Sequence, residues 1–321
     1  MTDVDGASLI TPVIIGPTAA GKSAIALHLA STYGLSIISA DSRQVYAGFN
    51  IGTAKPSADE QRLIPHYGID VLAPIARYSA HEWARDAERW GRESRAQGRM
   101  PVVVGGTGFY VRALVDPLDD TPSLEPSRRA ALGSWLATLD AETLERWCRR
   151  LDPARAALGR TQRLRAVETA LLAGRRISEW SVGNADVEAT AASSRPLARQ
   201  ARYLVVDPGP ALATRIAGRV AAMVADGWFD EVRALMDYVP ADAPAWQASG
   251  YARVRDAVAG VIPPAEAVER VIIETRQYAK RQRTWCRHQL PGAQVTRVDS
   301  SAPDALALAR AWWESDDGSA T

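Results

Sequence analysis

Residues 12–23 read P-V-I-I-G-P-T-A-A-G-K-S, and this stretch decides the fold. Its last eight residues fit the pattern G-x-x-x-x-G-K-[ST] and directly follow a short apolar run. Between a strand and a helix, such a pattern is typical of a loop whose backbone N–H groups bind phosphate. The alternative is a glycine-rich turn of purely structural use. The sequence therefore predicts di- or triphosphate binding, but the loop alone indicates neither the phosphate nor the reaction.

The chemical groups of this loop each have a use in binding phosphate. Its glycines let backbone amides approach an anion without an intervening Cβ. Lys22 brings a positive charge, and the hydroxyl of Ser23 is a ligand for Mg²⁺, the cofactor that we expect. The residues of the loop predicted to bind a diphosphate or nucleotide are Gly16, Pro17, Thr18, Ala19, Ala20, Gly21, Lys22 and Ser23.

Apolar strands alternate with helices through the first third of the chain. Strands are predicted at 9–15, 36–40 and 101–104, and helices at 22–33 and 78–97, the second capped by Ser79 and ended by Gly98. This order predicts an α/β fold with a P-loop-containing, doubly wound parallel sheet. Such sheets bind ligands at the carboxyl ends of their strands, where residues 16–23, 41–46 and 105–108 lie.

The pattern changes after Asp116 and becomes mostly helical. Residues 126–181 read as helices, the Ala- and Ser-rich segment 183–200 as a mobile loop, and 203–208 as a strand that rejoins the sheet. Further helices are predicted at 210–226, 228–237, 248–259, 264–288 and 303–315. We therefore expect a catalytic core of residues 9–118 and 201–300, an all-helical insertion at 119–200, and a C-terminal helix and tail at 301–321.

The overall charge of the chain does not indicate a partner. Its 321 residues include 38 basic and 37 acidic side chains, which leaves a formal net charge of +1. The two cysteines, Cys148 and Cys286, lie far apart and predict neither a zinc site nor a disulfide framework. No apolar run approaches the roughly 20 residues of a membrane span. We expect a cytoplasmic protein without membrane contact, and we expect it to be a monomer.

Asp41 ends the second predicted strand and begins the run D-S-R-Q-V-Y. A carboxylate at this place lies opposite the phosphate loop, so it is a candidate general base or, through water, a ligand of Mg²⁺. A carboxylate that caps a turn or helix is the alternative. The polar run Ser42, Arg43 and Gln44 can present hydrogen-bond donors to a planar base.

Two other loops stand out by composition. Residues 50–56 read N-I-G-T-A-K-P, which is typical of a turn, and residue chemistry alone gives this loop no role. Residues 105–108 read G-G-T-G, where the glycines allow close backbone approach and Thr107 offers a hydroxyl. A structural turn is an equal alternative for this second loop.

Basic side chains gather on two predicted helices. Arg215 and Arg219 lie one turn apart and suit a pyrophosphate, although surface ion pairs are the alternative. The helix around 270–287 interleaves basic residues with Tyr278 and Trp285, which suits a nucleic-acid backbone with splayed bases. An ordinary amphipathic surface helix is the alternative there. Its basic residues are Arg270, Arg276, Lys280, Arg281, Arg283 and Arg287.

Taken together, these segments resemble the tRNA dimethylallyltransferases, also called tRNA isopentenyltransferases. The matching segments keep the family's order and cover residues from about 10 to 290. They are G-P-T-A-A-G-K-S at 16–23, S-A-D-S-R-Q-V-Y at 39–46, N-I-G-T-A-K-P at 50–56, V-G-G-T-G-F-Y at 104–110, R-I-A-G-R-V at 215–220, G-Y at 250–251 and T-R-Q-Y-A-K-R-Q-R-T-W at 275–285. The chain departs from the family in lacking the usual Asn-Asp pair near 158–168, which bears on the contacts implied for residues 160–164. It also lacks the zinc finger of eukaryotic relatives, which indicates a bacterial type.

The resemblance implies a reaction and assigns residues to it. A dimethylallyl group would pass from dimethylallyl diphosphate to the exocyclic amine of adenosine 37, next to the tRNA anticodon, giving N6-(dimethylallyl)adenosine and diphosphate. Asp41, Ser23 and Arg215 would be catalytic, residues 18–23 with Arg215 would hold the diphosphate, and the helical insertion would contact tRNA. Arg219 is also predicted to bind the diphosphate, because of its spacing to Arg215. The tRNA anticodon stem-loop would meet Asp41, Ser42, Arg43, Gln44, Thr107, Arg129, Gln162, Arg163, Gln247, Gly250, Tyr251, Arg276, Gln277, Lys280, Arg281 and Gln282.

Two other functions remain open at this point. A P-loop small-molecule kinase would account for the phosphate loop and the parallel sheet, but it leaves residues 39–56 and 275–285 unexplained. A nucleotide-gated RNA-binding protein without catalysis would need only a phosphate loop and a basic helix.

Overall fold

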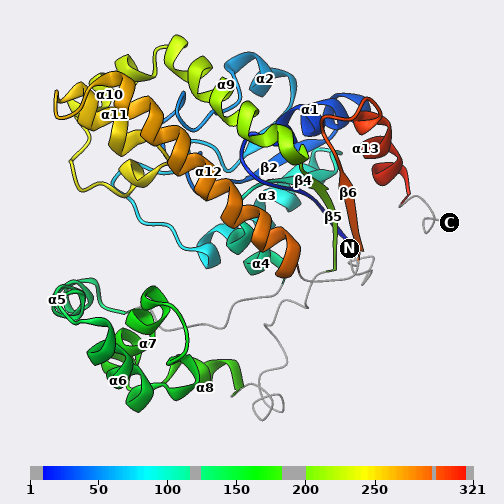
Figure 1. Cartoon of the computed structure of the whole chain (residues 1–321). Coiled ribbons are helices and arrows are strands. Elements are labelled where there is room, and N and C mark those ends of the chain that lie inside the picture. Colours follow the sequence, from blue (N-terminus) through cyan, green and yellow to red (C-terminus); the bar gives the residue numbers. More distant parts are fainter. Residues whose placement is uncertain (1–9, 116–123, 183–199, 291–293, 316–321) are drawn as a thin grey trace. The chain divides into compact units, whose positions relative to one another are not determined.

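The computed structural model describes residues 10–115, 124–182, 200–290 and 294–315 (Figure 1). The chain divides into two compact units, one formed by residues 1–117 with 198–321 and the other by residues 118–197. We call the first the core unit and the second the helical unit. The loop predicted at 183–200 lies outside the described residues except for Gln200.

A six-stranded parallel sheet organises the core unit, with the strand order β3-β2-β4-β1-β5-β6. The strands are β1 (Thr11–Ile15), β2 (Ser36–Ala40), β3 (His66–Tyr67), β4 (Pro101–Gly105), β5 (Ala201–Val206) and β6 (Gln294–Val298). In the register of the central strands, Ile14 lies beside Val104 on one side and Leu204 on the other. The predicted parallel sheet is confirmed, including the return of the chain to it as β5.

Helices cover the sheet in an arrangement that follows from its strand order. The chain leaves β1 through α1 (Lys22–Tyr33) to reach β2, and it turns back through α3 (Ala80–Ala96) to β4. Because both crossovers are expected to be right-handed and they run in opposite directions, α1 and α3 fall on opposite faces. α4 (Gly108–Val115) packs with α3, while α13 (Ala305–Glu314) packs with α1 (Figure 1).

Local sequence signals fix the ends of these helices. Ser79 caps α3 through a capping box, in which its side chain accepts from the N–H of Glu82 and Glu82 accepts from the N–H of Ser79. Gly34, in the left-handed conformation, ends α1, because a residue with a Cβ is strained there. The predicted bounds of α1 at 22–33 and the predicted cap of α3 are therefore confirmed.

The C-terminal helix belongs to the core unit and is not a separate segment. Ala305, Ala309 and Trp312 of α13 are buried in one apolar cluster with residues of β1, β4 and α1. Strand β6, which the sequence pattern did not predict, brings the chain to this place by pairing with β5. The predicted division at residue 301 therefore does not correspond to a boundary in the fold.

A second layer of helices lies on the carboxyl side of the sheet strands. It comprises α9 (Leu212–Ala225), α10 (Trp228–Met236), α11 (Tyr251–Val258) and the long α12 (Pro264–His288), whereas the short α2 (Ala58–Leu63) buries no residue. Their shared core gathers Phe49, Trp228, Trp246 and Tyr251, whose rings lie against one another. Among the described residues, no helix combines the length and the apolar character needed to cross a membrane.

The helical unit has an apolar core of its own. Its helices are α5 (Pro126–Ala137), α6 (Ala141–Leu151), α7 (Arg160–Ala173) and α8 (Ile177–Val182), as the sequence pattern predicted. Leu136, Leu144 and Val167 are buried together between the first three. The wholly buried Asp152 accepts hydrogen bonds from the N–H and the hydroxyl of Ser178, which ties α8 to the end of α6.

Candidate active site

The core unit contains a cavity of about 430 Å³ at the carboxyl ends of β1, β2 and β4. This volume lies within the range typical of small-molecule sites. One part of the lining is polar and comes from the strand ends and α12: Thr18, Lys22, Ser23, Asp41, Arg43, Gly106, Tyr278 and Gln282, with Arg219 from α9. The other part is apolar: Ile216, Val220, Met223, Trp228 and Val271.

The phosphate loop joins β1 to α1 and depends on its glycines. A Cβ on Gly16 would overlap the carbonyl oxygen of Val206 in the neighbouring strand. Gly21 has a φ of 92°, in the region that favours glycine. The Nζ atom of Lys22 donates to the carbonyl of Pro17 at 2.7 Å, so the ammonium bends back over the loop. The predicted strand–loop–helix placement of residues 16–23 is present.

The surroundings of Lys22 disfavour its charged form and so lower its pKa. Burial lowers its pKa to about 8, with a further lowering by the nearby guanidinium of Arg219 and an opposing effect of Asp41. The ammonium of Lys22 and the guanidinium of Arg219 thus lie near each other, with the carboxylate of Asp41 close by. An anion with more than one negative charge would relieve this repulsion, so the electrostatics favour a polyphosphate ligand.

The structure separates the roles of Arg215 and Arg219, which the sequence paired. Arg219 lines the cavity, and burial lowers its pKa. No residue that the structure describes gives its guanidinium a hydrogen bond or an ion pair. Arg215 instead donates to the carbonyl of Ala20 at 3.3 Å and to Ser300, and it is not part of the cavity lining. Of these two arginines, Arg219 is the one whose charge is available inside the cavity.

Asp41 follows β2 directly and lines the cavity. Its Oδ1 atom accepts a hydrogen bond of 2.8 Å from the N–H of Arg43, which fixes the carboxylate in a tight turn. The charge of Asp41 raises the pKa values of Lys22 and Tyr278, which places it near both side chains. Its second oxygen has no partner among the described residues and is free to accept a proton.

Gln282 connects two of the loops that form the polar end of the cavity. Its Oε1 atom accepts the N–H of Thr18 at 2.8 Å, and its Nε2 atom donates to the carbonyl of Gly106 at 2.8 Å. The side chain is therefore fully used inside the protein, although the resemblance implied a tRNA contact. Close by, the hydroxyl of Thr107 accepts the N–H of Ser42 at 3.1 Å, which joins the ends of β4 and β2.

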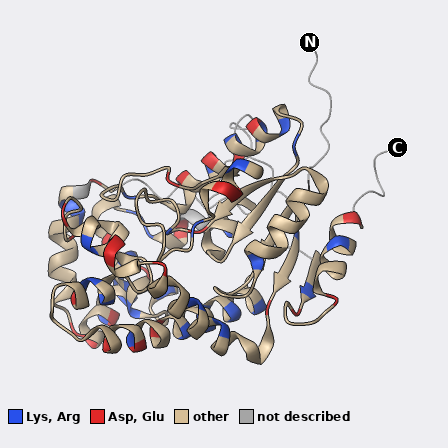
Figure 2. Ribbon diagram, turned by 90° about the horizontal axis from the view of Figure 1, so that it is seen from above, with Lys and Arg blue, Asp and Glu red and all other residues tan. Residues whose placement is uncertain are grey.

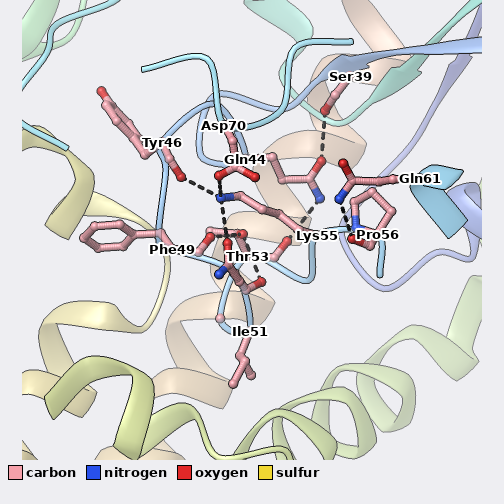
Figure 3. A network of polar contacts seen from close by, with 12 residues as sticks. Ser39, Gln44, Tyr46, Phe49, Ile51, Thr53, Lys55, Pro56, Gln61 and Asp70 are labelled. Atoms are coloured by element: carbon pink, nitrogen blue, oxygen red, sulfur yellow. Dashed lines mark hydrogen bonds and ion pairs between the residues drawn. The ribbon is translucent and has the colours of Figure 1, made fainter. Parts of the chain in front are cut away.

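The loop at 50–56, whose role the sequence left open, forms one wall of the cavity. Figure 3 shows the polar contacts that hold this loop. Gln44 holds it, since its Nε2 atom donates to the carbonyls of Thr53 at 3.2 Å and Ala54 at 3.1 Å. Lys55 is almost buried and donates to the carbonyl of Tyr46 at 2.6 Å, while its ammonium also pairs with Asp70. The amide of Gln44 is thus not free to meet a base.

Trp228 is the largest side chain of the apolar part of the lining and is 1% exposed. The chain passes so close to its indole that a Cβ on Gly52 or on Gly250 would overlap the ring. Met223 and Val220 from α9 complete this surface. Sequence reasoning missed it, because these residues read as ordinary core positions of amphipathic helices.

Four of the five residues of α12 predicted to contact tRNA lie on an exposed face, and the fifth, Gln282, is buried. Arg276, Gln277, Lys280 and Arg281 are all exposed, and the guanidinium of Arg281 lies 5.7 Å from the ring centre of Tyr278. Other basic residues of the helix are occupied: Arg270 pairs with Glu266, and Arg283 donates to Asp207 at 2.8 Å. Along many helices, basic and acidic positions alternate (Figure 2).

Of the residues around 250 that are predicted to contact tRNA, one is exposed and two are buried. Gln247 is exposed. Tyr251 is wholly buried, where its hydroxyl donates to Glu231 at 2.6 Å and accepts the N–H of Gly52 at 3.1 Å. Because the ring and the hydroxyl are both used inside the protein, Tyr251 is a structural residue and cannot meet RNA in this conformation. Gly250 is buried next to it.

The residues of the helical unit that are predicted to contact tRNA form hydrogen bonds and ion pairs within the unit itself. Arg129 pairs with Glu168 at 2.9 Å and keeps 44% of its side chain exposed. Gln162 accepts the N–H of Gly159 at 2.9 Å, which caps the start of α7. Arg163 donates to the carbonyl of Leu158 and to Glu145, with 19% of its side chain exposed. Arg129 and Gln162 are thus exposed, whereas Arg163 is only partly so.

The oxygen atoms available in the cavity suit an Mg²⁺ ion that is bound mainly through the phosphates of a substrate. Among the residues that the structure describes, no group of three or more His, Cys, Asp or Glu side chains could hold a metal ion. Ser23 and Asp41 both line the cavity and supply a hydroxyl and a carboxylate. Mg²⁺ commonly takes one or two protein oxygens and completes its shell with water and substrate phosphates, so these two residues fit.

Comparison with known proteins identifies relatives along nearly the whole chain. The family model "IPP transferase" matches residues 44–289, and the model "Isopentenyl transferase" matches residues 10–64. A tRNA dimethylallyltransferase from Deinococcus radiodurans is 37% identical over 302 residues, which is 92% of this chain and 95% of the relative. Another from Methylibium petroleiphilum is 40% identical, over 95% of this chain and 94% of the relative.

A solved structure agrees with these matches. The crystal structure of a tRNA isopentenylpyrophosphate transferase from Bacillus halodurans has a TM-score of 0.60 and 31% sequence identity, and the match covers 90% of this chain and 89% of that one.

Proposed function

The chain belongs to the IPP transferase family, and we propose that it transfers a dimethylallyl group from dimethylallyl diphosphate to tRNA. The acceptor is the exocyclic amine of adenosine 37, beside the anticodon, and the products are N6-(dimethylallyl)adenosine and diphosphate. The observation that carries this proposal is one cavity in which Lys22 and Arg219, the carboxylate of Asp41 and an apolar wall meet.

Each part of the cavity corresponds to a part of the substrates. The phosphate loop, at the start of α1, suits a diphosphate, since backbone N–H groups and the helix dipole favour an anion there. The apolar surface of Val220, Met223 and Trp228 suits the dimethylallyl group. The remaining polar lining around Asp41 leaves room for the edge of an adenine. The core unit is thus proposed to be a P-loop fold used for prenyl transfer.

The cations promote departure of the diphosphate. When the allylic carbon–oxygen bond breaks, negative charge grows on the diphosphate oxygens and positive charge on the allylic carbons. Lys22 and Arg219 are placed to stabilise the leaving group before the reaction begins, so little reorganisation is needed. Mg²⁺ bound to the diphosphate would supply further charge neutralisation, with Ser23 and, through water, Asp41 as its protein ligands.

Asp41 is the group placed to remove the proton of the amine. An exocyclic adenine amine is a weak nucleophile, and a carboxylate within hydrogen-bond reach assists its attack on the allylic carbon. The Arg43 N–H holds one carboxylate oxygen, so the other is presented in a fixed direction. The same turn carries Ser42 and Arg43, which are candidates for contacts to the base.

The exposed face of α12 is proposed to bind the tRNA anticodon stem-loop. Arg276, Lys280 and Arg281 follow one another at helical spacing on it, and Tyr278 lies beside them in the cavity lining. The adenosine must leave the stacked anticodon loop to reach Asp41, at an unstacking cost of a few kcal/mol. The helical unit, with the accessible Arg129, is proposed to contribute further tRNA contacts.

Incubation with dimethylallyl diphosphate, Mg²⁺ and unmodified tRNA, followed by mass analysis of the nucleosides, tests this function. An adenosine heavier by one dimethylallyl group supports it. In a parallel incubation with ATP as the phosphoryl donor, a product heavier by one phosphate would instead indicate a kinase. Binding of tRNA without any modified nucleoside would indicate a binding protein.

A further inference from the structure

Ser300 lies against the phosphate loop from the far end of the chain. Its hydroxyl donates to the carbonyl of Ala20 at 2.5 Å and accepts from the Nη1 atom of Arg215 at 2.9 Å. The Nη2 atom of Arg215 donates to the carbonyl of Ser300 at 3.0 Å. A serine just beyond β6, an arginine of α9 and the peptide before α1 are thus joined.

This arrangement fixes one peptide group of the phosphate loop. The carbonyl of Ala20 receives hydrogen bonds from both Ser300 and Arg215. In a trans peptide the C=O and the following N–H point in opposite directions, so the N–H of Gly21 is turned away from Ser300. Gly21 is the N-cap residue of α1 and has a left-handed φ of 92°.

We propose that Ser300 is a positioning residue for the allylic diphosphate, which acts by orienting the Ala20–Gly21 peptide together with Arg215. The inference rests on the proposed function, since it concerns the same diphosphate site. It gives Arg215 a role outside the cavity, in fixing the loop, and leaves Arg219 as the arginine of this pair that lines the cavity.

Nothing in the family match assigns this role. The matched residues end at 289, whereas Ser300 follows strand β6, which ends at Val298. The contact of Ser300 with the loop depends on β6 pairing with β5, because that pairing carries residues 299–301 to the carboxyl end of the sheet next to β1 and the loop. The Asp207 N–H also donates to the carbonyl of Val298 at 3.0 Å, which fixes the turn that follows.

Steady-state kinetics of the full-length Ser300→Ala variant test the inference, with dimethylallyl diphosphate and tRNA varied separately. A lost hydrogen bond of ordinary strength predicts a KM for the diphosphate that is roughly threefold to tenfold higher. The KM for tRNA and the melting temperature should stay as in the wild type. Ser301→Ala is the matched control, because Ser301 bonds to Asp299 and not to the loop. Ser300→Thr, which keeps the hydroxyl, should restore most of the affinity.

A double-mutant cycle with Arg215→Ala provides a second measurement. Because both side chains bind the carbonyl of Ala20, their effects on the KM for the diphosphate should be less than additive. An unchanged KM for the diphosphate in an active Ser300→Ala enzyme would overturn the inference, as would equal changes in both KM values with a lower melting temperature. A wild-type enzyme that modifies no tRNA would instead overturn the proposed function.

Discussion

The guanidinium of Arg219 lowers the pKa of Lys22, although the two residues belong to different helices, α9 and α1. Both side chains line the same cavity, where burial also lowers the pKa of each. In the folded protein the pKa of Lys22 is therefore about 8, below the ordinary lysine value of 10.5.

This relationship predicts how diphosphate binding depends on pH. As the pH rises through about 8, Lys22 becomes neutral and the affinity for the anion should fall. In Arg219→Gln the neighbouring cation is gone, so the pKa of Lys22 rises and the fall in affinity moves to higher pH, although affinity is weaker at every pH. Calorimetric titration with dimethylallyl diphosphate without tRNA, from pH 6 to 10, measures this. Identical pH dependence in both proteins would contradict the assignment, and Arg255→Gln, remote from the cavity lining, is the control.

Asp41→Asn should lower turnover by roughly two to four orders of magnitude, which is the usual cost of losing a general base. The asparagine side chain has the same shape as the aspartate, and its oxygen can still accept the N–H of Arg43. The affinity for tRNA should therefore change little. Single-turnover rates together with filter binding of tRNA measure the two quantities. Asp242→Asn, an exposed carboxylate far along the chain, is the control. Near-normal turnover in Asp41→Asn would remove this carboxylate from the mechanism.

Much of the fold could be predicted because its signals are local. The apolar run before the phosphate loop and the periodic pattern after Pro263 set β1 and α12, and α12 occupies 264–288 as predicted. Strand β6 was missed because Q-V-T-R-V is short and mostly exposed, so its assignment depends on the edge of β5 beside it. Strand β3, with two residues, has no sequence signal at all.

The candidate site was predicted less completely, because it depends on partners far away in sequence. Spacing alone cannot tell which of Arg215 and Arg219 faces the cavity, since that depends on how α9 packs. The buried position of Tyr251 follows from its bonds to Glu231 and Gly52, which no local pattern indicates. The apolar wall around Trp228 likewise forms only when several helices come together.

Met223→Ala should widen the apolar part of the cavity and relax the choice of allylic chain. Met223 is 8% exposed, and its removal should raise the ratio of kcat/KM for geranyl diphosphate over dimethylallyl diphosphate. Competition between the two diphosphates, with mass analysis of the modified nucleosides, measures this ratio. Met236→Ala in α10, outside the cavity lining, should leave it unchanged. A ratio that stays at the wild-type value would mean that the allyl group does not lie against Met223.

Lys55→Met should destabilise the core unit. The methionine keeps the apolar stem but leaves the carbonyl of Tyr46 and the carboxylate of Asp70 without their partner. Loss of such buried hydrogen bonds predicts a decrease of about 1–3 kcal/mol in the free energy of unfolding. Urea denaturation measures it, with Arg62→Met as the control, because Arg62 and its partner Asp59 are both exposed. Equal stability of the two variants would show that the Lys55 network contributes little.

The exposed face of α12 should control the salt dependence of tRNA binding. Lys280 and Arg281 have no carboxylate partner among the described residues, so both are available for phosphates. Each lost phosphate contact should reduce the slope of log affinity against log salt by roughly 0.7–0.9. Lys280→Ala combined with Arg281→Ala should therefore flatten the slope and weaken binding to all tRNAs alike.

Arg270→Ala on the same helix is the matched control, because Arg270 already pairs with Glu266 and should contribute little. Binding measured at several salt concentrations decides between the outcomes. An unchanged slope in a stably folded double variant would mean that tRNA binds elsewhere and that this face of α12 is an ordinary solvated surface.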